Sequence, residues 1–196
     1  MPTTTPKGRP DQNGQQSQSG QGGNRPHSGQ IVVLSGPPGS GKTSVAKALI
    51  PLLPQPVACI EGDRFWKFIV KPDARERHQN FRILIRSMTA ACIPFARSDF
   101  TVVLDFSIPP AMLDTLRTIV KEIPLHYVLL RPSVETCALR AAGRDAGKIA
   151  DYETLRGFYT LFAGEGAGDA LCDETASPET LAAQIVSGLA AGQFKR

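Results

Sequence analysis

The sequence predicts an α/β fold of three layers, in which a five-stranded parallel sheet is flanked by helices. Two observations support this prediction. Short apolar runs alternate along the chain with longer segments that repeat apolar residues at helical spacing. The short runs are apolar nearly throughout, which is typical of strands buried on both faces of a parallel sheet.

The first 29 residues differ from the rest in composition. Residues 1–29 contain no Leu, Ile, Val or Phe, and Pro, Gly, Gln, Ser and Thr dominate. Such a segment cannot bury enough apolar surface to offset its ordering entropy. We therefore expect a disordered tail at 1–29 and one domain at 30–196. Because we find no secretory signal and no apolar run long enough to span a bilayer, we expect a cytoplasmic protein with no membrane partner.

Five runs are expected to form the strands of the sheet. Four of them, QIVVLSG, VACIEGD, TVVLDF and LHYVLL, are short and mostly apolar. The fifth, DALCDET, is the weakest. The expected strands are residues 30–36, 57–63, 101–106, 125–130 and 169–175.

Six segments that alternate with these runs are expected to be helical. The first is stopped by Pro51, and the second carries one apolar stripe from Phe81 to Phe95. Pro109 and Pro110 introduce the third, and the region after Ser133 suits the start of the fourth. The last two carry apolar side chains on one face. The expected helices are residues 42–50, about 75–96, 111–121, 133–144, 151–162 and 177–192.

The ends of three expected strands point to a shared crevice. Ligands of open α/β sheets bind beyond the carboxyl ends of the strands. This rule brings the regions near Ser35, Asp63 and Asp105 to one edge of the fold. We therefore expect the functional site at that edge.

The first strand runs directly into GPPGSGKT, which matches G-x-x-x-x-G-K-[ST] with a strand before it and a helix after it. The glycines let the backbone curl so that its N–H groups point at phosphate oxygens. Lys42 would neutralise the β- and γ-phosphates, and Thr43 would supply a hydroxyl to Mg²⁺. The alternative is a structural glycine-rich turn. The expected nucleotide-binding residues are Gly36, Pro37, Pro38, Gly39, Ser40, Gly41, Lys42, Thr43 and Ser44.

Two classes of phosphate-binding protein fit poorly. A guanine-specific GTPase would carry N-K-x-D, which none of the asparagines here provides, and a motor or AAA-type machine needs a longer chain.

Residues 30 to about 192 resemble the small-molecule kinases of the P-loop superfamily, including shikimate, gluconate and chloramphenicol kinases and zeta-toxin-like proteins. The motifs that carry this resemblance are GPPGSGKT, EGDRFW, VVLDFS and CALRAAGR.

The resemblance assigns a role to the acid that ends the second strand. In these kinases such an acid lies beside the acceptor hydroxyl, and Asp63 occupies the matching place. It would orient or deprotonate that hydroxyl. The alternative is that Asp63 caps the following helix. Arg64 and Trp66 are further candidates for contact with the acceptor, although Arg64 could face solvent and Trp66 could belong to the core.

Asp105 ends the third expected strand, where a Walker B acid would hold Mg²⁺ directly or through water. Ser107 is a weaker candidate for the same neighbourhood. The alternative is that Asp105 caps a helix before Pro109. Thr43 and Asp105 are thus the expected magnesium ligands.

Two arginines complete the expected catalytic set of Lys42, Asp63, Arg140 and Arg144. Arg140 and Arg144 lie four residues apart, in a C-x-x-R-x-x-x-R pattern that resembles the lid of these kinases. The resemblance implies that they clamp the adenine side and the transferring phosphate. A solvated helix end is the alternative for Arg140 and Arg144. Arg82 and Arg86, also four residues apart, could grip an anionic acceptor, but a solvated face of the long helix is the preferred interpretation.

These residues predict an enzyme that uses ATP and Mg²⁺ to phosphorylate a hydroxyl group of a small molecule. Two other functions stay open, namely a kinase of a nucleic-acid 5′-hydroxyl or nucleotide sugar, and a non-catalytic ATP-binding switch. The net charge is +4, and Lys7, Arg9, Arg25 and Asp11 place about half of it in the tail. This balance argues against nucleic acid as a partner.

Overall fold

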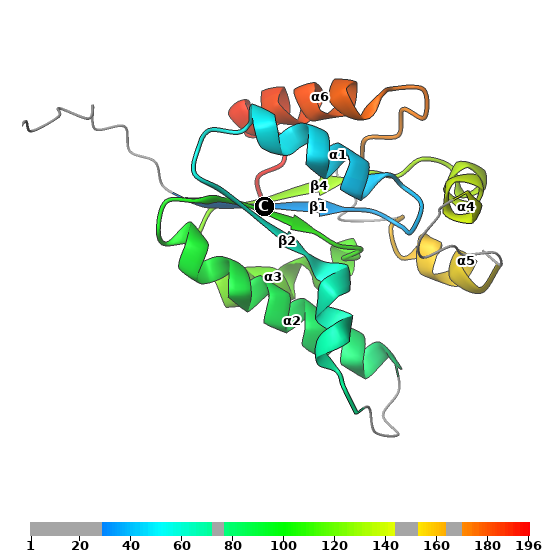
Figure 1. Cartoon of the computed structure of the whole chain (residues 1–196), viewed down its shortest axis with the longest axis horizontal. Helices are drawn as coiled ribbons and strands as arrows, with labels where there is room; N and C mark the ends of the chain where they lie inside the picture. The colour runs from blue at the N-terminus through cyan, green and yellow to red at the C-terminus, as the bar shows by residue number, and fades with distance from the viewer. Residues whose placement is uncertain (1–28, 72–76, 144–152, 164–169) are drawn as a thin grey trace, which may run out of the picture.

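The computed structural model describes residues 29–71, 77–143, 153–163 and 170–196. Residues 1–28 of the expected tail and Arg144 lie outside these residues. Within the described part, four strands form one parallel sheet in the order β2-β3-β1-β4 (Figure 1). The strands are β1 (Gln30–Ser35), β2 (Val57–Glu61), β3 (Thr101–Asp105) and β4 (Leu125–Leu129).

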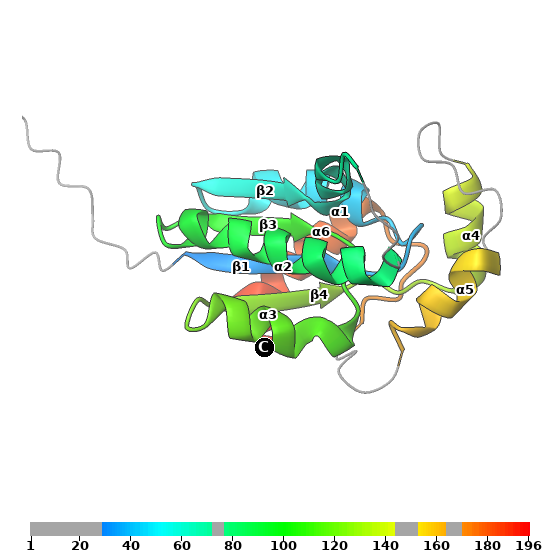
Figure 2. The same cartoon turned by 90° about the horizontal axis from the view of Figure 1, so that it is seen from below.

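Helices cover both faces of the sheet, as the sequence predicts. In Figure 1, α1 and α6 lie on one face, and α2 and α3 lie on the other; Figure 2 looks at this second face and shows α2 and α3 side by side in front of the sheet. The remaining helices, α4 and α5, lie beyond the carboxyl ends of the strands. The helices are α1 (Lys42–Leu49), α2 (Arg77–Ala96), α3 (Leu113–Val120), α4 (Val134–Ala142), α5 (Glu153–Thr160) and α6 (Pro178–Ala190). Short 3₁₀ helices are η1 (Ile50–Leu52), η2 (Gly62–Phe68) and η3 (Pro110–Met112).

The central strand β1 is buried on both faces. Ile31 and Val33 pack into the cluster that α2 and α3 complete, while Val32 and Leu34 pack into the cluster under α1 and α6. All four side chains are fully buried. The edge strand β2 differs, because its residues are only partly buried or exposed. The nearly continuous apolar runs therefore mark the inner strands. One hydrophobic cluster lies on each face of the sheet.

The prediction of a fifth strand at 169–175 is wrong for the described residues. Leu171 forms a single parallel bridge with Leu130, in which the Leu171 amide donates to the Leu129 carbonyl at 2.8 Å. The chain then turns, because the Asp173 carboxylate accepts hydrogen bonds from Thr175 and Ala176. A side chain that bonds to nearby backbone amides competes with strand pairing, so the ladder stops after one bridge.

The C-terminal residues cover the other part of the β4 edge. The Tyr127 amide donates to the Phe194 carbonyl at 2.8 Å, and the Arg196 amide donates to the Leu125 carbonyl at 2.9 Å. Two short pieces of chain thus satisfy an edge that a fifth strand would otherwise pair.

Two helix starts are confirmed by their caps. The Ser133 hydroxyl accepts a hydrogen bond from the Thr136 amide at the start of α4, and Ser177 does the same for Thr180 at the start of α6. Among the helices in the described part of the chain, none is long and apolar enough to cross a membrane.

Candidate active site

The loop between β1 and α1 adopts a conformation that requires glycine. Gly39 and Gly41 have φ of 84° and 95°, in the left-handed region that other residues rarely adopt. A β-carbon added at Gly39 would lie 2.1 Å from the carbonyl oxygen of Cys137. The loop is therefore in close backbone contact with α4, a contact that the motif alone does not reveal.

Lys42 lies across this loop. Its ammonium group donates hydrogen bonds to the carbonyl oxygens of Gly36 and Pro37, each at 3.0 Å, and the residue is 9% exposed. Beside it, the Ser40 hydroxyl is buried and has no hydrogen-bond partner among the described residues. A buried polar atom without a partner is costly unless a ligand or water satisfies it. The loop thus carries a positive charge and an unused polar group, which suit an anionic ligand.

Thr43 and Asp105 are brought together from distant parts of the sequence. The Thr43 hydroxyl donates a 2.8 Å hydrogen bond to Oδ2 of Asp105. Burial raises the pKa of the Asp105 carboxyl, the Thr43 hydrogen bond and Lys42 lower it, and the charges of Asp63 and Glu61 raise it further. A buried carboxylate beside a hydroxyl offers oxygen ligands of the kind that Mg²⁺ binds, while the described residues contain no group of three or more His, Cys, Asp or Glu side chains that could hold a metal ion.

The segment after β3 is fastened to the end of β1. Ser35 donates to the Ile108 carbonyl at 2.6 Å and accepts from the Ile108 amide at 2.9 Å. The Tyr127 hydroxyl donates to the same carbonyl at 2.7 Å. These buried bonds hold the chain that follows Asp105, and they join residues 73 and 19 positions apart. Sequence spacing contains no signal for such pairs.

Asp63 lies in the first turn of η2, directly after β2. Its side chain is exposed, and no hydrogen bond or ion pair within the described residues occupies it. The backbone beneath is fixed, because a β-carbon added at Gly62 would lie 2.5 Å from the Phe106 ring. The Asp63 carboxylate therefore lies on a well-packed turn, and it is close enough to Asp105 for its charge to raise the pKa of the Asp105 carboxyl.

The neighbours of Asp63 divide between surface and core. Arg64 forms an exposed ion pair with Glu61 at 2.6 Å. Trp66 and Phe65 are partly buried and pack against the cluster that includes Phe106. Phe68, which also follows Asp63, is 71% exposed, with its ring centroid 5.1 Å from that of Phe65.

An aromatic series runs from the end of β3 to α5. The ring centroids of Phe81 and Phe106 are 5.6 Å apart, those of Phe81 and Phe158 are 5.7 Å apart, and those of Phe158 and Phe162 are 5.4 Å apart. Phe81 belongs to the apolar stripe expected on the long helix, whereas the sequence offers no such signal for Phe158. This series ties α2 and α5 to the strand end that carries Asp105.

Arg140 lies beside the phosphate loop. Its Nη1 is 3.9 Å from the position of a β-carbon at Gly41, and its Nη2 donates to the Glu174 carbonyl at 3.0 Å. Arg82 and Arg86 are exposed on α2. Arg144 falls outside the described residues, so its predicted role stays a prediction. Glu174 is a neighbour of Arg140 that sequence reasoning misses, because 34 residues separate them.

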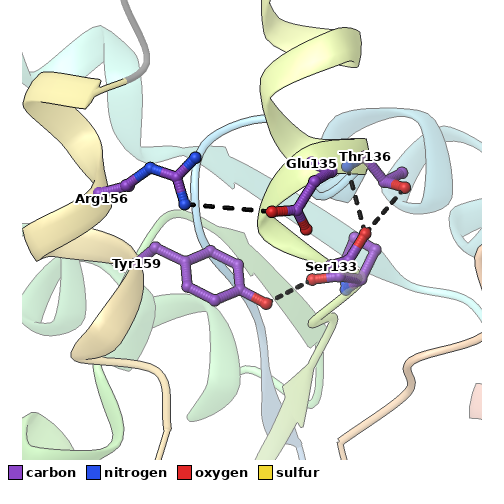
Figure 3. A network of polar contacts seen from close by, with 6 residues as sticks. Ser133, Glu135, Thr136, Arg156 and Tyr159 are labelled. Atoms are coloured by element: carbon purple, nitrogen blue, oxygen red, sulfur yellow. Dashed lines mark hydrogen bonds and ion pairs between the residues drawn. The ribbon is translucent and has the colours of Figure 1, made fainter.

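Figure 3 shows how the start of α4 is held against α5. The Tyr159 hydroxyl, from α5, donates to the Pro132 carbonyl at 2.7 Å. Arg156, one turn earlier on α5, reaches Glu135 at 4.0 Å. The Ser133 hydroxyl bonds Thr136 within the first turn of α4. The two helices beyond the sheet thus form a connected unit next to the phosphate loop.

The family model described as chloramphenicol phosphotransferase-like protein matches residues 29–156, which is more than half of the chain. No curated protein matches. The match includes the phosphate loop, Asp63, Asp105 and Arg140, and ends within α5.

Solved structures share the fold at low sequence identity. The Deinococcus radiodurans tunicamycin resistance protein has a TM-score of 0.64 at 20% identity, covering 85% of this chain and 98% of that one. The APS kinase of Mycobacterium tuberculosis, solved with AMPPNP and APS, has a TM-score of 0.63 at 18% identity, covering 83% and 98%. A gluconokinase from Sinorhizobium meliloti has a TM-score of 0.57 at 23% identity, covering 86% and 95%. The fold is that of the P-loop kinases.

Proposed function

The chain belongs to the chloramphenicol phosphotransferase-like family, and we propose that it transfers the γ-phosphate of ATP to a hydroxyl group of a small molecule. The observation that carries this proposal is the exposed Asp63 carboxylate. It lies at the carboxyl ends of the strands, where Thr43, Asp105 and the phosphate loop also lie. A phosphate-binding loop alone fits many functions. A free carboxylate beside it adds the group that an acceptor hydroxyl needs.

The loop residues suit the triphosphate of a nucleotide. The curled backbone at Gly39 and Gly41, the unpartnered Ser40 hydroxyl and the Lys42 ammonium provide donors and positive charge on one side. Thr43 and Asp105 would hold Mg²⁺, which neutralises the developing charge on the β- and γ-phosphates.

In the proposed step, the acceptor oxygen attacks the γ-phosphorus while the bond from that phosphorus to the β,γ-bridging oxygen breaks. ADP leaves, and the proton of the hydroxyl moves to the Asp63 carboxylate. Lys42 and Arg140 stabilise the charge on the transferring group. Binding of the acceptor should exclude water from this site, because ATP would otherwise be hydrolysed.

The test measures ATP consumption over a panel of sugars, small alcohols, phenicol- and aminoglycoside-type antibiotics, nucleotide sugars and 5′-hydroxyl oligonucleotides, and product mass is read for each hit. We expect one acceptor to gain one phosphate. Lys42→Ala and Asp63→Asn should each abolish the gain, while Asp114→Asn, on the exposed face of α3, should leave it unchanged.

Two results would contradict the proposal. Phosphate gained by the oligonucleotide alone, with affinity falling steeply as salt rises, would make the chain a nucleic-acid kinase. ATP binding without transfer to any acceptor, unaltered by Asp63→Asn, would make it a nucleotide-dependent switch.

A further inference from the structure

Glu174 contacts α4 at both ends of the helix. Its carboxylate accepts hydrogen bonds from the Ser133 amide and the Thr136 hydroxyl, at the first turn. Its backbone carbonyl accepts the 3.0 Å bond from Arg140, in the last turn. One residue outside the helix therefore contacts both its first turn and its arginine, Arg140.

The position of α4 is transmitted to the phosphate loop through two contacts. The Cys137 carbonyl lies against Gly39, and the guanidinium of Arg140 lies next to Gly41. The Cys137 carbonyl leaves no space for a β-carbon at Gly39, so a small rotation of α4 would press this carbonyl into the loop or move Arg140 away from it.

The charge of Glu174 suits this place. Hydrogen bonds from the Thr136 hydroxyl and the Ser133 amide lower the pKa of the Glu174 carboxyl, and the charge of Arg140 lowers it further. The carboxylate is thus ionised at neutral pH, and it faces the amino-terminal end of α4, where the helix dipole favours a negative charge.

The opposite side of the first turn is held separately. Tyr159 bonds the Pro132 carbonyl, and Arg156 reaches Glu135 (Figure 3). These contacts join α4 to α5 and do not involve Arg140. Glu174 is therefore the residue through which the start of α4 and the Arg140 guanidinium are connected.

We propose that Glu174 is a positioning residue, which holds α4 on the phosphate loop so that Arg140 points at the bound nucleotide. This inference rests on the proposed function, because it assumes that the loop binds ATP. Glu174 itself would contact neither the phosphates nor the acceptor.

The test is a double-mutant cycle in the Kd of a non-hydrolysable ATP analogue with Mg²⁺, measured by calorimetry without an acceptor. Glu174→Ala and Arg140→Ala should each weaken binding by about fivefold, and the double variant should be no weaker than the weaker single variant. Glu174→Gln should recover part of the affinity, since its amide oxygen can still accept one of the two bonds.

Glu179→Ala is the matched control. Glu179 is an exposed glutamate in the first turn of α6, so the substitution removes the same charge from a helix start that does not touch the phosphate loop. Its Kd should equal that of the wild type. A merely structural role for Glu174 would lower the melting temperatures of Glu174→Ala and Glu174→Gln without changing the Kd of either variant.

Independent, multiplicative effects of Glu174→Ala and Arg140→Ala would overturn the inference, as would a wild-type Kd for Glu174→Ala. If Glu174→Ala does not fold, Glu174→Gln and Thr136→Val decide, and an unchanged Kd in both would overturn it. If the chain transfers phosphate to no acceptor but the effects of Glu174→Ala and Arg140→Ala on the Kd are coupled, the proposed function is contradicted and the role of Glu174 is not. If the chain transfers phosphate but the two effects on the Kd multiply independently, only the role of Glu174 is contradicted.

Discussion

The hydroxyl of Thr43 donates a 2.8 Å hydrogen bond to the carboxylate of Asp105, across 62 residues of sequence. The contact exists because β1 and β3 are neighbours in register, with Leu34 opposite Asp105. The first residues of α1 and the end of β3 therefore meet at one edge of the sheet. Parallel pairing of non-consecutive strands thus creates the candidate magnesium site.

Asp105→Asn should separate activity from stability. Because burial is the largest cause of the raised pKa of Asp105, its ionised form costs folding free energy at neutral pH. We expect activity to fall by about 10- to 100-fold and to require more Mg²⁺, by analogy with altered metal-site groups. The melting temperature should stay the same or rise. A large drop in melting temperature would show that Asp105 has a structural role instead.

Gly39→Ala should destabilise the fold and abolish nucleotide binding. The left-handed backbone and the 2.1 Å approach to the Cys137 carbonyl leave no room for a methyl group. We expect a loss of about 1–3 kcal/mol in the free energy of unfolding. Gly157→Ala is the control, since a β-carbon at this helical position meets nothing within 4 Å. It should stabilise α5 by about 0.5–1 kcal/mol. Urea denaturation of both variants checks the difference.

Ser35→Ala should destabilise the protein more than Tyr127→Phe does. Ser35 both donates to the Ile108 carbonyl and accepts from the Ile108 amide, so alanine removes two buried hydrogen bonds, while the Ile108 amide keeps its 3.0 Å bond to the Phe106 carbonyl. The loss should be about 2 kcal/mol. Phenylalanine at position 127 removes one of the two donors to the Ile108 carbonyl, at about 1 kcal/mol. Equal losses in thermal denaturation would mean that the two donors contribute alike.

Acidification should destabilise the chain through His126. This side chain is 7% exposed on β4, Nδ1 has no partner among the described residues, and burial followed by the charge of Lys195 lowers its pKa. Above the ordinary pKa of 6.5 the His126 imidazole is neutral in both the folded and the unfolded state, so it contributes no pH dependence to the free energy of unfolding. As the pH falls below that value, the unfolded chain binds the proton first, and folding becomes less favourable until the folded pKa is reached.

The measurement is the free energy of unfolding between pH 7 and pH 5. His126→Gln should remove part of the decline, whose slope reaches at most about 1.4 kcal/mol per pH unit for one group. His78→Gln is the control, since His78 is exposed on α2. An identical pH dependence in the wild type and His126→Gln would contradict this assignment.

Much of the fold follows from local patterns in the sequence. The strands and helices lie close to their expected ranges, because apolar periodicity and helix caps act over a few residues. The phosphate loop is also local: Gly39, Gly41 and Lys42 carry their function in one short motif next to a strand. The family match confirms the kinase resemblance that these motifs predict.

Local patterns fail where contacts join distant segments. The run 169–175 resembles a strand, but the Asp173 turn and the C-terminal residues leave β4 with two short partners instead. Phe158 in the aromatic series and Glu174 beside Arg140 have no spacing signal either.

The sequence by itself determined the alternation of strands and helices, the phosphate loop, and the carboxylates Asp63, just after β2, and Asp105, at the end of β3. Tertiary structure decided the number of strands, the Thr43–Asp105 bond and the bond between Arg140 and the Glu174 carbonyl. The physical reason is the range of the interactions. Backbone propensity and apolar spacing act between near neighbours, whereas side-chain hydrogen bonds and edge pairing depend on which distant segments folding brings together.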